Sequence, residues 1–375
     1  MNYYRSLTEE AVRLLDIPDE PDIYHRIRRW ARVHIKHESV APIDTMNWPK
    51  GCLMCGLVYQ ARMKKGADNT VDRAASIYGM AAVQSHIDKW IAAEAPLYFV
   101  DDVLAGQALL MLADFYKDDD PETYMRYMKV ADGIMKFLYD HDADAEGVLP
   151  YRPAQKTGQI FADSLGMIVP FAVLYGLMKQ DDDAIGFARN QITYAMKHLA
   201  DPEIGLPWHV YSLDEASAET GGADPEAKIY GALGWGRALG WIMYGLGASA
   251  WAFDLYPPKT PEAIRSSKTF TALLDQMSDI ALQFRREDGL FGSIIHDPET
   301  PADTSASAMI LYGIKQRDYR AERGVKRESY IDPILPYIGS DGKVKGAQGE
   351  CMGIGQYSDT YGSYPWSVGM TMLLL

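Results

Sequence analysis

Cysteine is scarce in this sequence and follows no framework pattern. Only three cysteines occur among 375 residues, namely Cys52, Cys55 and Cys351, and a sparse, odd set argues against a disulfide-stapled scaffold. Cys52 and Cys55 have the C-x-x-C spacing of zinc and redox sites, but no second pair or paired histidine follows them. Because their neighbours are apolar and helical, we interpret these two as small buried side chains.

Positive charge and long apolar runs are also lacking. Lys and Arg number 37 against 51 Asp and Glu, a formal net charge of -14, which argues against a nucleic-acid partner because phosphate binding requires clustered cations. No run of 18 or more apolar residues occurs, so no membrane partner is expected. The first residues lack the apolar core of a signal peptide, and we expect a cytoplasmic protein.

Strand-like alternation is nearly absent, whereas helical periodicity recurs from end to end. The periodicity predicts twelve helices, near residues 22–36, 51–65, 69–91, 102–117, 121–139, 160–179, 182–199, 235–253, 261–286, 303–316, 326–337 and 364–375. Amphipathic helices such as 121–139 alternate with helices that are apolar nearly all round, such as 164–177. Six outer and six inner helices indicate an all-α, single-domain (α/α)6 toroid over residues 1–375; a superhelical repeat scaffold is the rival.

The starts of the apolar helices gather acidic, aromatic and glycine residues. These starts are Trp48-Pro49-Lys50-Gly51, Asp101-Asp102, Asp163-Ser164-Leu165-Gly166, the segment 234–241, Asp303-Thr304-Ser305 and Tyr364-Pro365-Trp366-Ser367. In a toroid all inner helices run the same way, so their starts would meet at one mouth. Helix N-termini there favour an anion, and aromatic rings suit the faces of sugars. Two irregular segments, about 201–232 and 339–363, are long enough to carry function.

Asp163 is the leading candidate for a catalytic residue. It lies in an apolar helix start, about three residues inside the periodic pattern, where desolvation tends to raise the pKa of a carboxyl group. A raised pKa suits a general acid at neutral pH, although a helix N-cap is the alternative. The same two interpretations apply to Asp101 and Asp102, whereas Asp303 is interpreted mainly as a cap.

His209, Arg237 and Trp241 are candidate substrate-binding residues. His209 lies on a loop among Gly, Pro and aromatic residues, where histidines commonly bind or catalyse; a satisfied structural histidine is the alternative. Arg237 and Trp241 are four residues apart and share one helical face. Arg offers a planar fork for a carboxylate or hydroxyl groups and Trp offers a platform, whereas the alternative is a structurally paired Arg beside a core Trp.

The order of these motifs resembles a known family. The stretches W-x-x-G, an acidic pair before Gly, D-S-L-G-M-x-x-P-F, G-L-x-x-H-x-Y and G-W-G-R-x-x-G-W follow one another within roughly residues 22–316. This order resembles glycoside hydrolase families 88 and 105, the unsaturated glucuronyl and unsaturated rhamnogalacturonyl hydrolases. Those enzymes are (α/α)6 barrels that act on oligosaccharides left by polysaccharide lyases.

The resemblance implies a reaction at a carbon–carbon double bond. The substrate would be a small oligosaccharide that ends in a 4,5-unsaturated uronic acid. A carboxylic acid, matching Asp163 here, protonates C4; water adds at C5, and the resulting hemiketal opens and releases the rest of the glycan. The resemblance also implies Asp101 as the second site carboxylate, with Asp102 as the competing choice, and it requires neither a metal nor a cofactor.

By the same resemblance, further substrate contacts fall to His209, Arg237 and Trp241, with Trp48 and Asp102 at the same mouth. Arg152 joins this set as a departure from the pattern, because the rhamnogalacturonyl group has a histidine near this position. Arg152 therefore indicates either another subsite or another substrate.

Three rival functions remain at this stage. An inverting hydrolase would use two carboxylates, an epimerase would need bases on both faces of a sugar, and a catalytically silent toroid would only bind glycans. The sequence leaves open the origin of the uronic acid, the next sugar and whether the protein forms a homo-oligomer.

Overall fold

The computed structural model describes residues 3–17, 46–64, 70–151, 158–213, 227–322 and 328–375, with five single positions between 27 and 35. The helices are α1 (Tyr3–Leu15), α3 (Trp48–Met63), α4 (Thr70–Ala92), α5 (Val103–Tyr116), α6 (Pro121–Tyr139), α7 (Ala162–Lys179), α8 (Asp182–Leu199), α10 (Gly236–Leu255), α11 (Pro261–Gln283), α12 (Thr304–Arg320), α13 (Glu328–Ile331) and α14 (Pro365–Met372). The short elements are the 3-10 turns Val100–Asp102 and Leu335–Tyr337 and the strands β1 (Ile160–Phe161), β2 (Trp208–Leu213), β3 (Ala227–Leu233), β4 (Ala347–Gln348) and β5 (Tyr361–Gly362).

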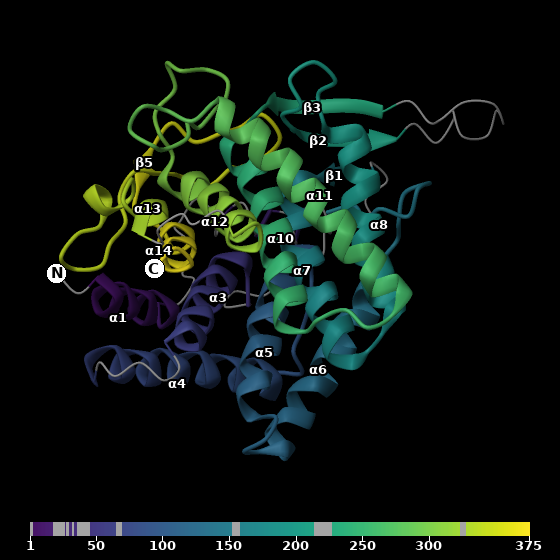
Figure 1. The fold of residues 1–375 in the computed structure, drawn as a ribbon, viewed down its shortest axis with the longest axis vertical. Coiled ribbons are helices and arrows are strands. Elements are labelled where there is room, and N and C mark those ends of the chain that lie inside the picture. Colours follow the sequence, from purple (N-terminus) through teal and green to yellow (C-terminus); the bar gives the residue numbers. More distant parts are fainter. Residues whose placement is uncertain are drawn as a thin grey trace.

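Within the described residues, six helices form a closed inner ring. Helices α3, α5, α7, α10, α12 and α14 each pack against the next, and α14 packs back on α3. Helices α4, α6, α8 and α11 lie outside this ring (Figure 1), each with one buried face, and of these α6, α8 and α11 are amphipathic. The predicted all-α (α/α)6 toroid is therefore confirmed.

The ring explains why its helices are apolar all round. Helix α7 has the length and composition of a membrane span, yet 78% of it is buried inside the protein. A helix that packs against two ring neighbours and one outer helix has no wet face, so it needs no polar stripe. The apolar character of α7 thus follows from its place in the ring.

Two helices differ from the predicted set. Helix α1 was missed; it packs against α3, α4 and α14 and buries Glu10, whose charge is paired with Arg13 at 2.6 Å. The predicted helix 326–337 is reduced to α13 and a 3-10 turn, because Pro333 and Pro336 each lack a backbone donor. Most of the predicted helix 22–36 lies outside the described residues.

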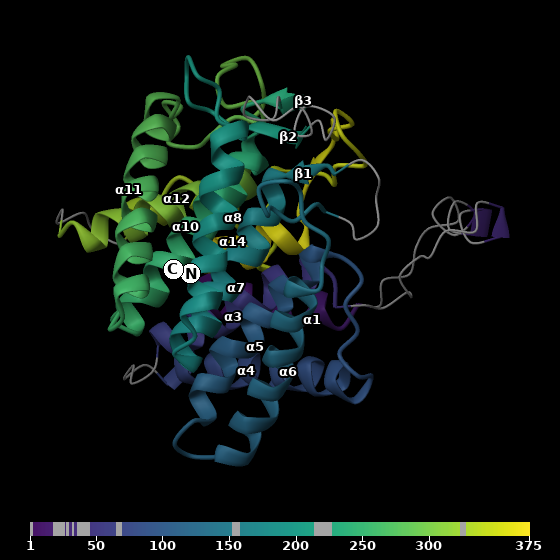
Figure 2. The ribbon, with the colours of Figure 1, turned by 90° about the vertical axis from the view of Figure 1, so that its right-hand side faces the viewer.

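A small sheet covers one end of the ring. Strands β1, β2 and β3 pair antiparallel in that order, and β1 and β3 run into the starts of α7 and α10. Figures 1 and 2 both show the sheet at that end of the ring. The sheet therefore places the segment 208–213 beside the inner-helix starts.

The interpretation of the C-x-x-C pair as buried side chains is confirmed. Cys52 and Cys55 are fully buried free thiols on α3, and the Cys55 thiol donates to the Leu104 carbonyl at 3.6 Å. Burial raises the pKa of Cys55 to about 12, so neither nucleophilic attack nor metal binding is favoured there.

We predict that thiol reagents will distinguish the three cysteines. In the folded protein only Cys351, which is partly exposed, should react, and slowly, because burial raises its pKa to about 11. All three should react in denaturant. Titration with a chromogenic disulfide reagent measures this; two rapidly reacting thiols in the native protein would contradict it.

Candidate active site

Asp163 and His209 form the centre of the candidate site. Asp163 is the second residue of α7, which has no side-chain N-cap, so its carboxylate does not cap its own helix. Its Oδ2 atom lies 3.1 Å from Nε2 of His209, with side chains 16% and 2% exposed respectively. The two atoms are close but not aligned as a hydrogen bond, and catalytic hydrogen bonds commonly align only when substrate is bound.

His209 lies on β2 opposite an irregularity in β3. The pairs Trp208↔Leu233 and Val210↔Tyr230 leave His209 opposite two residues instead of one, which is the arrangement of a β-bulge. The imidazole packs at centroid distances of 5.3 Å from Phe161 and 4.5 Å from Trp235. Bulges commonly redirect a side chain beside an active site, and here the imidazole reaches the start of α7.

The two acidic residues before α5 have different environments. Oδ2 of Asp102 accepts the backbone N–H groups of Tyr98 at 2.7 Å and Phe99 at 3.1 Å. Oδ2 of Asp101 instead accepts the hydroxyl of Tyr151 at 2.7 Å. Burial, and secondly the neighbouring charge of Asp101, raise the pKa of Asp102 to about 7.

A repeated turn relates two parts of the site. After α6, the Asp144 N–H donates to the Val148 carbonyl; after α8, the corresponding bond joins residues 201 and 206. Each turn contains a glycine in the left-handed region, Gly147 with φ 85° and Gly205 with φ 75°, where other residues are strained. The chain therefore leaves these two outer helices through similar turns, the second of which is one residue longer.

The repeat places Tyr151 and His209 in equivalent positions. Tyr151 lies three residues after Val148, and His209 lies three residues after Leu206, the residues whose carbonyls close the two turns. Each side chain contacts a carboxylate at the start of the preceding inner helix. Tyr151 pairs with Asp101 as His209 pairs with Asp163. This equivalence favours Asp101 over Asp102 as the second site carboxylate.

Arg237 is fully engaged with the late part of the chain. Its guanidinium donates from Nη1 to the Gln348 carbonyl at 2.7 Å and from Nη2 to the Gly349 carbonyl at 2.8 Å. It also lies over the rings of Trp235 and Trp366, at 4.9 and 5.6 Å. Arg237 is only 2% exposed, and its guanidinium donates to the backbone. Its predicted contact with substrate stays a prediction.

Gln348 joins the starts of two inner helices to the late part of the chain. Its N–H donates to Oδ1 of Asp303 at 3.2 Å, and its Oε1 accepts from Trp235 Nε1 at 2.9 Å. Its Nε2 donates to the Ser358 carbonyl at 2.8 Å. Asp303 also caps α12, as the sequence indicated. Gln348 thereby fixes the segment 349–358 against the mouth.

Three tryptophans from different helices meet at the mouth. Trp48 on α3 lies 6.0 Å from Trp241 on α10 and 4.9 Å from Trp366 on α14, measured between ring centroids. Trp241 is only 2% exposed, whereas Trp48 is half-buried. Trp48 is therefore the better placed of the two predicted platforms to meet a sugar, with Trp241 supporting it.

The sequence analysis missed several site residues and named one that cannot be placed. Two of them, Tyr357 and Cys351, come from the Gly- and Tyr-rich segment 339–363. The hydroxyl of Tyr357 lies 3.0 Å from Nδ1 of His209. The pKa of the Cys351 thiol is raised mainly by burial and further by the charge of Asp163. That composition was the only local signal for them. Arg152 lies outside the described residues.

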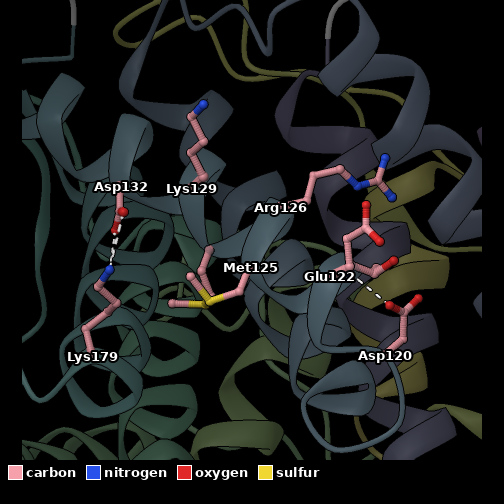
Figure 3. Close-up of a pocket in the computed structure, with 9 residues that line it drawn as sticks. Asp120, Glu122, Met125, Arg126, Lys129, Asp132 and Lys179 are labelled. Carbon is pink, nitrogen blue, oxygen red and sulfur yellow. Dashed lines mark hydrogen bonds and ion pairs between the residues drawn. The ribbon is translucent and has the colours of Figure 1, made fainter.

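An open hollow on the outer surface is a separate feature. It is lined by residues of α6 and by Lys179, which is ion-paired with Asp132 at 2.9 Å (Figure 3). Lys179 ends α7 and Asp163 begins it, so about 24 Å of helix separates them at 1.5 Å per residue. The hollow therefore does not belong to the candidate site.

The overall fold is similar to solved structures of glycoside hydrolases. A possible member of family 105 from Klebsiella pneumoniae has a TM-score of 0.73 at 16% identity, covering 99% of this chain and 91% of that chain. A family 105 glycoside hydrolase from C. acetobutylicum has a TM-score of 0.63 at 16% identity, covering 94% of this chain and 98% of that chain. Unsaturated glucuronyl hydrolase from Bacillus sp. GL1 has a TM-score of 0.60 at 14% identity, covering 99% of this chain and 94% of that chain.

Carboxylates, a histidine and aromatic rings at one mouth of an (α/α)6 toroid are the features of a glycan-processing enzyme. The model of Glycosyl Hydrolase Family 88 matches residues 24–375. The protein belongs to this family and is a glycoside hydrolase. The predicted family resemblance is thereby confirmed.

We predict that Arg237→Lys will lower the free energy of unfolding by about 2 kcal/mol, because a compact ammonium cannot reproduce two charge-assisted bonds to adjacent carbonyls. Urea denaturation measures this. The matched control is Arg285→Lys, which alters an exposed Arg-to-carbonyl bond of 2.9 Å and should change stability by less than about 0.5 kcal/mol. Equal losses in the two variants would contradict the role of Arg237.

A second prediction concerns the pH dependence of stability. The pKa of Asp102 is raised to about 7 from 3.8, so between these values the folded protein binds a proton that the unfolded chain does not, and stability falls as pH rises. Asp102→Asn removes this loss while its amide oxygen can still accept both backbone N–H groups. The variant should therefore gain stability relative to wild type from pH 5 to pH 8 in urea titrations. A constant difference between the two proteins would refute the assignment.

Proposed function

We propose that this glycoside hydrolase releases a 4,5-unsaturated uronic acid from the non-reducing end of small, lyase-generated oligosaccharides. The observation that carries the proposal is the pair of Asp163 and His209, in which a partly exposed carboxyl group is held beside a buried imidazole. The resemblance of the site motifs to the unsaturated uronyl hydrolases supports it. So does the similarity of the fold to an unsaturated glucuronyl hydrolase.

In the proposed reaction Asp163 acts first as an acid and then as a base. Its carboxyl group gives a proton to C4 of the C4=C5 enol ether, and positive charge develops at C5 and the ring oxygen. A water molecule adds at C5 and returns a proton to the Asp163 carboxylate. The hemiketal so formed opens, which releases the remaining glycan, and the net reaction consumes one water molecule.

The mouth suits an anionic sugar even though the protein carries a formal net charge of -14. Helices α7 and α10 both begin without a side-chain N-cap, so their dipoles are directed toward the site, although the first N–H of α10, that of Gly236, donates to the Ser293 carbonyl. Trp48 offers a half-buried ring at the same mouth. We assign the second carboxylate to Asp101, held by Tyr151.

For the finer substrate class we propose an unsaturated rhamnogalacturonyl disaccharide, because the motif order matches that group apart from the segment at Arg152. An unsaturated glucuronyl disaccharide is the second candidate, supported by the similar fold of the Bacillus enzyme. Parallel incubation with unsaturated disaccharides from several lyases would distinguish the two.

We predict that Asp163→Asn will abolish turnover, by a factor of at least about 10² to 10⁴, because an amide cannot donate the proton to C4. The measurement is the loss of absorbance of the enol ether during incubation with the preferred disaccharide. Trp241→Ala, which weakens the support of Trp48, should mainly raise KM.

Two outcomes would contradict the proposal. Wild-type protein that binds unsaturated disaccharides without changing their absorbance would indicate a glycan-binding protein. Cleavage of a saturated glycoside with the enol-ether band unchanged would indicate a conventional hydrolase. Calorimetry with Asp163→Asn should still detect binding, and equal melting temperatures would verify that the variant is folded.

A further inference from the structure

Tyr357 connects the bulge in β3 to the imidazole of His209. Its hydroxyl oxygen accepts the backbone N–H of Ala232 at 2.8 Å and lies 3.0 Å from Nδ1 of His209. The ring of Tyr357 packs 4.8 Å from that of Trp235. Tyr357 therefore contacts His209 at Nδ1, whereas Asp163 lies beside Nε2.

The bulge makes this contact possible. Because His209 faces two residues of β3, the N–H of Ala232 is not used in the strand ladder and is available to the hydroxyl. The other bulge residue, Gly231, has φ 79°, and a Cβ there would fall 2.7 Å from the Tyr357 hydroxyl and 2.9 Å from His209 Cβ. Glycine thus permits the close approach of the three elements.

The direction of the hydroxyl proton follows from these partners. Burial raises the pKa of Tyr357 to about 12, so the hydroxyl keeps its proton near neutral pH. Its oxygen accepts the N–H of Ala232, so the hydroxyl proton is available to Nδ1 of His209, which lies 3.0 Å away. A neutral imidazole that accepts at Nδ1 carries its own proton on Nε2.

We propose that Tyr357 is a positioning residue: by donating to Nδ1 it holds His209 uncharged, with the proton on Nε2. Asp163 then faces a neutral N–H donor, which favours its carboxylate form less than the full charge of an imidazolium would. This inference rests on the proposed function. Were Nε2 unprotonated, it could accept the acidic proton through Oδ2. Were His209 an imidazolium, its charge would hold Asp163 as a carboxylate.

The other titratable groups near this pair do not replace Tyr357. The Cys351 thiol is kept neutral by burial, which raises its pKa to about 11. The guanidinium of Arg237 donates to two backbone carbonyls. Phe161 and Trp235, which flank the imidazole, do not titrate. The protonation state of His209 is therefore set mainly by Tyr357 and Asp163.

The test is Tyr357→Phe, which removes the hydroxyl and keeps the ring. Nitrogen-15 NMR of the imidazoles, with His209 assigned by comparison with His209→Gln, follows protonation without substrate. Wild type should show the Nε2–H form at neutral pH. In the variant, which lacks the donor at Nδ1, the Nε2–H form should lose population at neutral pH to forms that carry a proton on Nδ1.

Kinetics supply the second readout. Because Nδ1 of His209 loses its donor in Tyr357→Phe, a second proton can bind there beside Asp163, and the pH profile of kcat should differ from that of wild type. At neutral pH kcat should fall about tenfold, while KM changes little. The matched control is Tyr230→Phe, which removes a hydroxyl of the same sheet that lies 3.3 Å from Ser212 and should leave titration and kcat as in wild type.

An Nδ1–H or charged His209 in neutral wild type, or identical titrations in wild type and Tyr357→Phe, would overturn the inference. If the variant fails to fold, the wild-type spectrum alone decides. Failure of the proposed function has a different signature: no unsaturated disaccharide is turned over, while the NMR shift between wild type and variant persists.

Discussion

The hydrogen bonds of Gln348 are the constraint on which the candidate site depends. Its N–H, carbonyl and side chain bind Asp303, Arg237 and Trp235, which come from the starts of two inner helices. A buried guanidinium without acceptors is costly, so Arg237 strongly favours this one arrangement of the late chain. That arrangement brings Tyr357 to His209, 148 residues earlier.

The same hydrogen bonds leave Arg237 with a structural role. Arg237 has the chemistry of a carboxylate-binding group, yet its two hydrogen bonds to carbonyls hold the backbone that carries Tyr357. In the proposed function, attraction for an anionic sugar would come from the starts of α7 and α10, which have no side-chain N-cap and whose dipoles act over a short range. An acidic protein can thus present a locally favourable mouth.

Local sequence determined most of the ring, but only part of the site. Helical period and the alternation of amphipathic with apolar helices are local properties, so the toroid could be predicted. Helix α1 has the same period, with Tyr4, Leu7, Ala11 and Leu15 on its buried face, and could have been predicted too. Asp163 and His209 stood out because each is unusual among its immediate neighbours. Tyr357 could not be identified, because its role requires a hydrogen bond across the whole site and a bulge in β3.

The toroid contains equivalent positions at successive inner-helix starts, and different side chains occupy them. Tyr151 and His209 leave the same kind of turn and meet Asp101 and Asp163 respectively. A tyrosine hydroxyl that donates to a carboxylate stabilises its charged form, and it has no second state near neutral pH. An imidazole can change both its charge and the nitrogen that carries the proton. The fold therefore places a tyrosine beside one carboxylate and an imidazole beside the other, and only the imidazole has two nitrogens between which a third residue can fix the proton.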